Sequence, residues 1–105
     1  MTTVRFYRTR GRVTGFSCQG HSGCAEAGWD IVCAAVTSAV RLAECTINDV
    51  LHAGAEVRID EKTAAITLRL PAAGVPGAEP ILEGLALYLC ELSKEYPDYL
   101  TVLEV

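Results

Sequence analysis

The chain has 105 residues, of which half are hydrophobic, and its formal net charge is −4. This length fits one domain that can bury a core without metals or disulfides, and the acidic balance argues against a general nucleic-acid-binding protein. The five cysteines are an odd number and contain no Cys-x-x-Cys pair, which argues against a disulfide framework and a thioredoxin-like motif.

The first 19 residues predict a β-hairpin, because residues 3–8 and 13–19 are rich in β-branched and aromatic side chains and flank Gly11. The second strand ends at Gly20 and His21. Four arginines with no acid among them lie in this hairpin and form either a solvated strand face or a docking patch: Arg5, Arg8, Arg10 and Arg12.

Residues 22–29 are mostly small and include two glycines, which predicts a mobile loop. A helix is predicted from Asp30, as its N-cap, to about Leu51, with an end near Gly54. Apolar residues at helical spacing predict its core face: Val32, Val36, Ala39, Val40, Ala43, Ile47, Val50 and Leu51.

Cys33 does not belong to that apolar face. It begins a polar stripe and is expected to point outward from the first helical turn, near unpaired N–H groups and the positive end of the helix dipole. Such surroundings lower the pKa of a thiol and favour the thiolate. The other members of the stripe are Thr37, Arg41, Glu44 and Asn48.

The second half of the chain predicts a second hairpin around residues 60–62, with one buried face formed by alternating apolar residues. Residues 71–80 hold three prolines and two glycines and predict a connection. A helix over 81–96 and a strand over 100–105 follow. The fold class is therefore α+β, a ββαββαβ two-layer sandwich with a mainly antiparallel sheet and two helices, in one domain over residues 1–105.

His21 and Cys33 are the leading candidates for chemistry, because a thiol beside an imidazole can perform nucleophilic acyl transfer. A cysteine in a small domain is otherwise most often an inert packing residue. Asp30 either caps the helix only or also orients His21 by accepting its second ring proton. A carboxylate this close would also raise the thiol pKa, so its net effect has no definite sign from sequence.

A zinc site is the alternative to a catalytic Cys–His pair. Cys18, His21, Cys24 and Cys33 offer three sulfurs and one nitrogen at spacings that zinc can use. Against it, Cys33 would have to be drawn from the helix toward the strand end. Cys45 and Cys90 are expected to be packing residues within helices.

The chain resembles the ribosomal-processing cysteine proteases called Prp. The resemblance is densest at Gly20-His21, at Gly28, and at residues 30–35 with the letters DIVCAA. It implies that His21 and Cys33 are a catalytic dyad with Asp30 as an accessory residue. The family often has a serine where Thr37 stands here, so the hydroxyl is kept.

The same resemblance implies a substrate and a partner. Family members remove a short N-terminal extension, ending in paired phenylalanines, from a large-subunit ribosomal protein, the twenty-seventh in the usual naming. A homodimer without a cofactor is implied, and we expect no direct nucleic-acid contact. The chain lacks an apolar run of about 18 residues and a signal peptide, so we expect a cytoplasmic protein without a membrane partner. The competing class is a catalytically silent, ribosome-associated binding module.

Overall fold

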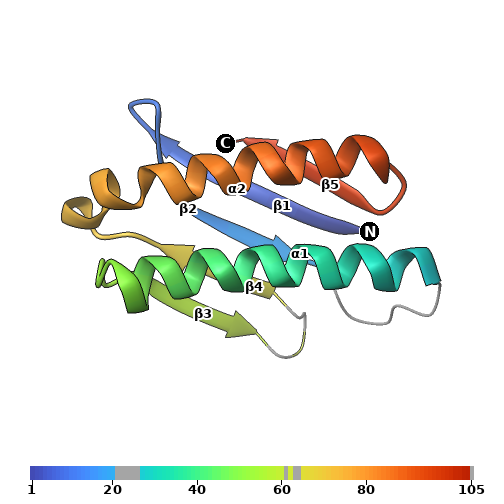
Figure 1. The fold of residues 1–105 in the computed structure, drawn as a ribbon, viewed down its shortest axis with the longest axis horizontal. Helices are drawn as coiled ribbons and strands as arrows, with labels where there is room; N and C mark the ends of the chain where they lie inside the picture. Colours follow the sequence, from blue (N-terminus) through green and yellow to red (C-terminus); the bar gives the residue numbers. More distant parts are fainter. Residues whose placement is uncertain (21–26, 61, 63–64, 105) are drawn as a thin grey trace.

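The computed structural model describes residues 1–20, 27–60, 62 and 65–104. The predictions for His21 and Cys24, and for the side chain of Asp30, lie outside this described part of the chain. The elements in chain order are β1 (Thr2–Thr9), β2 (Arg12–Gln19), α1 (Ala27–Cys45), a π-helical turn (Thr46–Val50), β3 (Glu56–Asp60), β4 (Ala65–Arg69), a 3-10 turn (Ala72–Gly74), α2 (Val75–Glu95) and β5 (Leu100–Glu104) (Figure 1).

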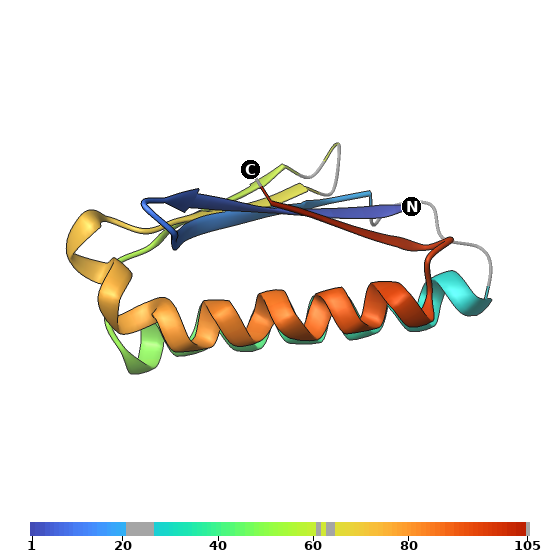
Figure 2. The same cartoon turned by 90° about the horizontal axis from the view of Figure 1, so that it is seen from above.

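The strands form one five-stranded sheet in the order β3-β4-β2-β1-β5. Neighbouring strands are antiparallel except β1 and β5, which are parallel. Both helices cover the same face of the sheet and leave the other face open (Figure 2). This architecture confirms the predicted α+β two-layer fold.

The first hairpin turns at Arg10 and Gly11, whose φ angles are 54° and 79°. Two successive residues with positive φ match the right-handed twist of the flanking strands, and Thr9 accordingly pairs with Arg12. The predicted first hairpin is confirmed.

The core lies between the helix layer and the sheet. Phe6 and Phe16 pair across β1 and β2, with ring centroids 6.1 Å apart. Side chains spaced three or four residues apart on each helix bury themselves against these strands. Those of α1 are Val32, Val36, Val40 and Ala43, and those of α2 include Leu82, Leu85 and Leu89.

The first helix begins earlier than the N-cap prediction at Asp30, which was wrong. α1 starts at Ala27, so Asp30 lies within its first turn and Cys33 is its seventh residue. After Cys45 the helix widens into the π-helical turn, which ends at Val50 with Leu51 as its C-cap, in agreement with the predicted end at about Leu51.

The second helix also begins earlier than predicted, because it starts at Val75 rather than near Ile81. Pro76 stands in its first turn, where the missing N–H costs nothing. Pro80 lies inside the helix and leaves the carbonyl of Pro76 without its usual donor. Pro76 is exposed, so water can satisfy that carbonyl. The proline-rich segment is therefore largely helical.

The segment Ile31–Val50 is long and apolar enough to cross a membrane, judged by length and by a mean hydropathy of 1.3. Its valines at 32, 36 and 40 are at most 1% exposed and face the sheet. These valines account for part of its apolar character, as the core face of a helix in a two-layer domain, and 28% of the segment is buried.

Arg8 and Arg12 of the first hairpin form ion pairs with described residues. Arg8 donates to Glu83 of α2 at 2.6 Å and to Glu104 of β5 at 3.0 Å. These carboxylates raise the pKa of Arg8, and Arg8 lowers the pKa of Glu83. The Nε atom of Arg12 lies 3.8 Å from the Oε2 atom of Glu79. These pairs favour a strand face tied to α2 and β5 over a docking patch for these two arginines.

Thr2→Val is expected to stabilise the fold. The Thr2 hydroxyl is fully buried and has no hydrogen-bond partner among the described residues, and a buried unsatisfied hydroxyl costs about 1 kcal/mol or more. Valine has the same shape without the polar atom. Urea unfolding should show a rise of about 1 kcal/mol in the free energy of unfolding.

Thr14→Val is the matched control, because the Thr14 hydroxyl donates to the Tyr7 carbonyl at 3.2 Å. That change should leave stability unchanged or lower it. A loss of stability in Thr2→Val would mean that its hydroxyl has a partner.

Candidate active site

Cys33 lies on one flank of α1. Val32 and Val36 are fully buried under the helix, and Cys33 and Thr37 each follow one of them by one residue, a rotation of about 100°. Ala35 precedes Val36 and lines a groove that α1 shares with α2. The flank with Cys33 therefore points away from α2, toward the half of the sheet that holds β4 and β3.

Cys33 is partly buried, so the prediction that it points outward is only partly right. Thr37 and Arg41 of the predicted polar stripe are exposed, whereas Glu44 and Asn48 are half-buried like Cys33. Asn48 bonds to the N–H and the carbonyl of Ala55, at 2.8 and 3.1 Å. The stripe thus runs along the border between α1 and the sheet, where a side chain is sheltered but reachable.

The ionisation of Cys18 is coupled electrostatically to that of Cys33. Cys18 belongs to β2, is fully buried and points toward the helices. Burial raises its pKa to about 12, and the charge of a Cys33 thiolate raises it further. The Cys18 thiol therefore stays protonated at neutral pH.

Two members of the rival zinc set, Cys18 and Cys33, lie in the described part of the chain. Within residues 1–20, 27–60, 62 and 65–104, no group of three or more His, Cys, Asp or Glu side chains could hold a metal. The other two members of the rival zinc set, His21 and Cys24, lie outside those ranges.

Gly20 ends β2 immediately before His21. Its φ is +94°, a conformation that side-chain-bearing residues rarely adopt, and a Cβ here would overlap with the carbonyl oxygen of Met1. The backbone of Gly20 therefore packs directly against the start of β1. Only glycine can occupy this position, directly before His21, without a steric clash.

Cys45 and Cys90 differ from each other. Cys90 is half-buried in α2, but Cys45 is exposed, so the prediction of a packing role for Cys45 was wrong. The Cys45 thiol donates to the Asp49 carboxylate at 3.4 Å, and this bond raises the thiol pKa. Cys45 is accessible but poorly ionised.

Brief treatment with iodoacetamide near neutral pH is expected to modify Cys33 before Cys45 and Cys18. The thiolate is the reactive form, and the pKa values of Cys18 and Cys45 are both raised. Peptide mapping at short times measures the order. Modification of Cys45 before Cys33 would count against an activated thiol at Cys33, and a peptide substrate should slow the labelling of Cys33 alone.

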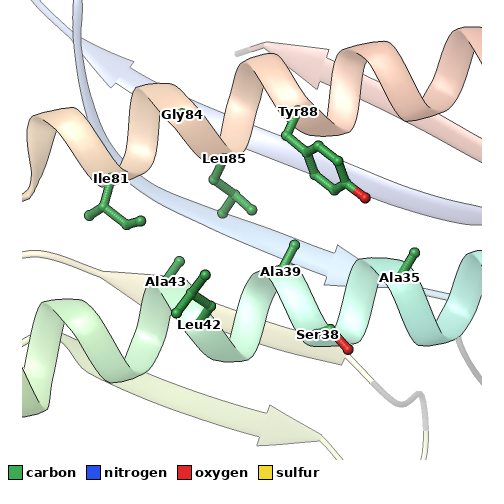
Figure 3. Close-up of a pocket in the computed structure, with 9 residues that line it drawn as sticks. All are labelled: Ala35, Ser38, Ala39, Leu42, Ala43, Ile81, Gly84, Leu85 and Tyr88. Carbon is green, nitrogen blue, oxygen red and sulfur yellow. The ribbon is translucent and has the colours of Figure 1, made fainter.

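A separate apolar groove lies between α1 and α2 on the side away from the sheet (Figure 3). Ala35, Ala39 and Ala43 of α1 border this groove because they recur every four positions and so share one side of the helix. This spacing is visible in the sequence, but it did not lead to a predicted groove. Cys33 does not line it, so this groove is not the reaction site. Its lining is Ala35, Ser38, Ala39, Leu42, Ala43, Ile81, Gly84, Leu85 and Tyr88.

The chain was compared with known protein families. The family described as "Cysteine protease Prp" matches residues 1–101. The chain belongs to this family. It is accordingly a cysteine protease with the predicted α+β fold.

Solved structures agree with the family assignment. SMU.848 from Streptococcus mutans is similar with a TM-score of 0.91 and 22% identity, over all of this chain and 94% of that chain. The essential ribosomal processing protease Prp from S. aureus, in complex with a substrate peptide, gives 0.90 and 22% over the whole of both chains. The same S. aureus protease with a covalently linked product peptide gives 0.87 and 23%, again over both whole chains. No curated protein matches the sequence.

Proposed function

We propose that this protein is an endopeptidase in which Cys33 is the nucleophile and His21 the general base. The observation that carries the proposal is the placement of Cys33 on the flank of α1, partly buried, in a chain of the Prp family. The other cysteines of the described residues suit the task less well. Cys18 is fully buried, Cys45 is held protonated by Asp49, and Cys90 lies in α2, away from the flank of Cys33.

The reaction runs through a thioester. His21 takes the proton of the Cys33 thiol, and the sulfur attacks the carbonyl carbon of the scissile peptide bond. The C–N bond then breaks, and the leaving amine receives the proton from His21. Water, activated by His21, attacks the thioester and releases the new carboxylate and the Cys33 sulfur.

The oxyanion of the tetrahedral intermediates needs hydrogen-bond donors. Because Cys33 lies in the second turn of α1, the backbone N–H groups that could serve are not those next to the nucleophile. In a regular α-helix the N–H of the seventh residue is bonded to the carbonyl four residues earlier. The Cys33 N–H, at the seventh position of α1, is therefore committed to the helix and is not a free donor for the oxyanion. Among the described residues, the N–H groups of α1 without helical partners are those of residues 27–29.

Three accessory residues support the dyad in this proposal. Gly20 fixes the backbone path into His21, as its contact with Met1 requires. Asp30 lies one turn before Cys33 and orients His21 through its second ring nitrogen. Thr37 lies one turn after Cys33, with an exposed side chain on the same flank.

The proposed substrate is the precursor of the twenty-seventh large-subunit ribosomal protein, cut at its N-terminal extension. The family membership supports this choice, as does the likeness to an S. aureus ribosomal processing protease bound to a substrate peptide. The proposed place of action is the cytoplasm, where ribosomal precursors are made.

Mass spectrometry of the purified precursor, incubated with the protein, tests the substrate. Removal of the extension at one site by the wild-type protein, and no cleavage by Cys33→Ala, is the expected result. Tight binding of the precursor without cleavage would instead support a silent ribosome-associated binding module.

We also propose that the protein is a homodimer, as the family resemblance implies. Leu42 is 64% exposed beside the groove of Figure 3, and Tyr88 is 48% exposed on its other side. In a two-fold pair the same patch meets itself, so Leu42 of each copy can enter the groove of the other. Light scattering should give twice the chain mass for the wild type and a lower mass for Leu42→Glu.

A further inference from the structure

The open face of the sheet, which neither helix covers (Figure 2), carries more positive than negative charge. Alternation along the strands places three arginines and two carboxylates there, because the buried residues between them face the helices. These five charged side chains are Arg5, Arg58, Arg69, Glu56 and Asp60.

The helix layer has the opposite charge. The described side chains of residues 31–50 and 75–95 include two cations, Arg41 and Lys94, and six carboxylates: Glu44, Asp49, Glu79, Glu83, Glu91 and Glu95. The net charge of −4 therefore averages two unlike faces. An acidic chain can in this way present a cationic surface to a polyanion.

One cross-strand row of the open face has an arginine at each end. Arg58 of β3 pairs with Thr67 of β4. Thr67 pairs with Ser17 of β2, and Ser17 pairs with Arg5 of β1. Neighbouring strands are about 4.8 Å apart, so the backbones of the two arginines lie roughly 14 Å apart, with two hydroxyl-bearing residues between them.

The adjacent row holds an arginine stacked on a tyrosine. Arg69 of β4 pairs with Gly15 of β2, and Gly15 pairs with Tyr7 of β1. Because Gly15 has no side chain, Arg69 reaches across β2, and its Cζ atom lies over the Tyr7 ring, 5.6 Å from the centroid. The Tyr7 and Ser17 hydroxyls share a hydrogen bond of 3.3 Å. Arg69 is thus held against the sheet, yet it remains exposed.

Two of these arginines are available to an anion. Within the described part of the chain, Arg5 and Arg69 form no ion pair with a carboxylate, whereas Arg58 is paired with Glu56. A polar hollow of about 360 Å³ lies beside Arg69 and is also lined by Thr67. A guanidinium matches the geometry of a phosphate and also stacks through its plane.

We propose that the open face of the sheet binds single-stranded RNA, with Arg5 on a phosphate and Arg69, backed by Tyr7, under a base. The bases of a single strand are open, and proteins stack them on aromatic rings and arginine planes. An acidic polypeptide would meet the same charges but would leave the stacking plane unused. The proposal replaces the expectation of no nucleic-acid contact, and it does not depend on the peptidase, because α1 lies on the other side of the sheet.

Fluorescence anisotropy with a labelled single-stranded RNA of about 12 nucleotides tests the proposal. Arg69→Gln should weaken binding about tenfold, because it removes a charge and the stacking plane together. Arg5→Gln should weaken binding about threefold and make the slope of log affinity against log salt shallower by about 0.7, the value for one phosphate of a single strand. No binding of this RNA by the wild type would overturn the proposal.

Arg41→Gln is the matched control. Arg41 is an exposed arginine of α1, so its loss changes the net charge by the same amount on the helix layer. This variant should bind the RNA like the wild type. An equal loss of affinity in Arg41→Gln and Arg69→Gln would mean that the RNA responds to net charge alone, which contradicts a site on the open face.

Arg69→Lys separates charge from stacking. Lysine keeps the positive charge but lacks the planar group. It should therefore keep the salt dependence of the wild type while its affinity stays several-fold lower. Full wild-type affinity in Arg69→Lys would contradict the stacked base.

A polyglutamate peptide with the same net charge as the RNA tests the other class of polyanion. The wild type should bind the RNA at least about tenfold more tightly, because only the RNA has bases to stack. Equal binding of the two polyanions would assign the face to an acidic polypeptide and overturn the RNA proposal. Cleavage of a short peptide, measured in parallel, should be the same in the wild type, Arg5→Gln and Arg69→Gln, so the test of the peptidase remains separate.

Discussion

Cys33→Ala is expected to reduce peptide hydrolysis by at least about 1,000-fold, because it removes the atom that forms the thioester. Its melting temperature should stay close to that of the wild type, since Cys33 is only partly buried at the flank of α1 and alanine is a strong helix former. Initial rates on the ribosomal precursor, together with thermal unfolding, measure both effects.

Cys45→Ala is the control for this variant. Cys45 lies on the same helix and is exposed, but its thiol is bonded to Asp49 and its pKa is raised. Its loss should leave the rate unchanged. A Cys33→Ala protein that still cleaves at more than a tenth of the wild-type rate would assign the nucleophile to another residue.

His21→Ala is expected to lower kcat by about 100-fold to 10,000-fold, the usual contribution of a positioned general base. Labelling of Cys33 by iodoacetamide should also slow, because the imidazole no longer takes the thiol proton. Added imidazole should restore part of the cleavage rate. A purely structural histidine would not produce this rescue.

His52→Ala is the control, since His52 is the second of the two histidines in the chain. It is exposed just beyond the π-helical turn, with a φ of 51°, far along the chain from Cys33. Wild-type cleavage by His21→Ala, or an equal loss in both histidine variants, would remove His21 from the mechanism.

The period of the apolar residues was enough to predict the elements and their order. Apolar residues alternate in residues 2–19 and recur at helical spacing in residues 32–47. In both segments the apolar face predicted from the pattern is the face that packs in the core. Whether β5 joins the sheet parallel or antiparallel depends on which edge the chain reaches after α2. This pairing depends on long-range contacts, so it cannot be predicted from the local pattern of apolar residues.

The helix starts were the weak point of the sequence reasoning. Glycine and proline were read as loop signals, but Gly28 lies in the first turn of α1 and Pro76 in the first turn of α2. Proline is tolerated there because the first N–H groups of a helix have no helical partner. Glycine costs about 1 kcal/mol relative to alanine within a helix, which weakens the helix without ending it. The consequence reached the site, since it moved Cys33 from the first turn to the second.

The surroundings of Cys33 could be predicted only in part. Its position beside the core face followed from helical spacing, and the half-buried state followed less well because it depends on the sheet under that flank. The electrostatic coupling of Cys18 to Cys33 and the exposure of Ile59 were not accessible from sequence. Both depend on the register of β2, β4 and β3, whereas alternation predicted only that one face of the second hairpin is buried.

The most direct test of the central claim, that Cys33 is the nucleophile of a peptidase, is labelling with a peptidyl vinyl sulfone. The peptide copies the residues before the cleavage site, and peptide mapping by mass spectrometry locates the adduct. One label per chain on Cys33, prevented by the ribosomal precursor and accompanied by complete loss of cleavage, is the predicted result. Labelling at Cys24 or Cys45 in its place, or full cleavage by a protein whose Cys33 is completely modified, would contradict it.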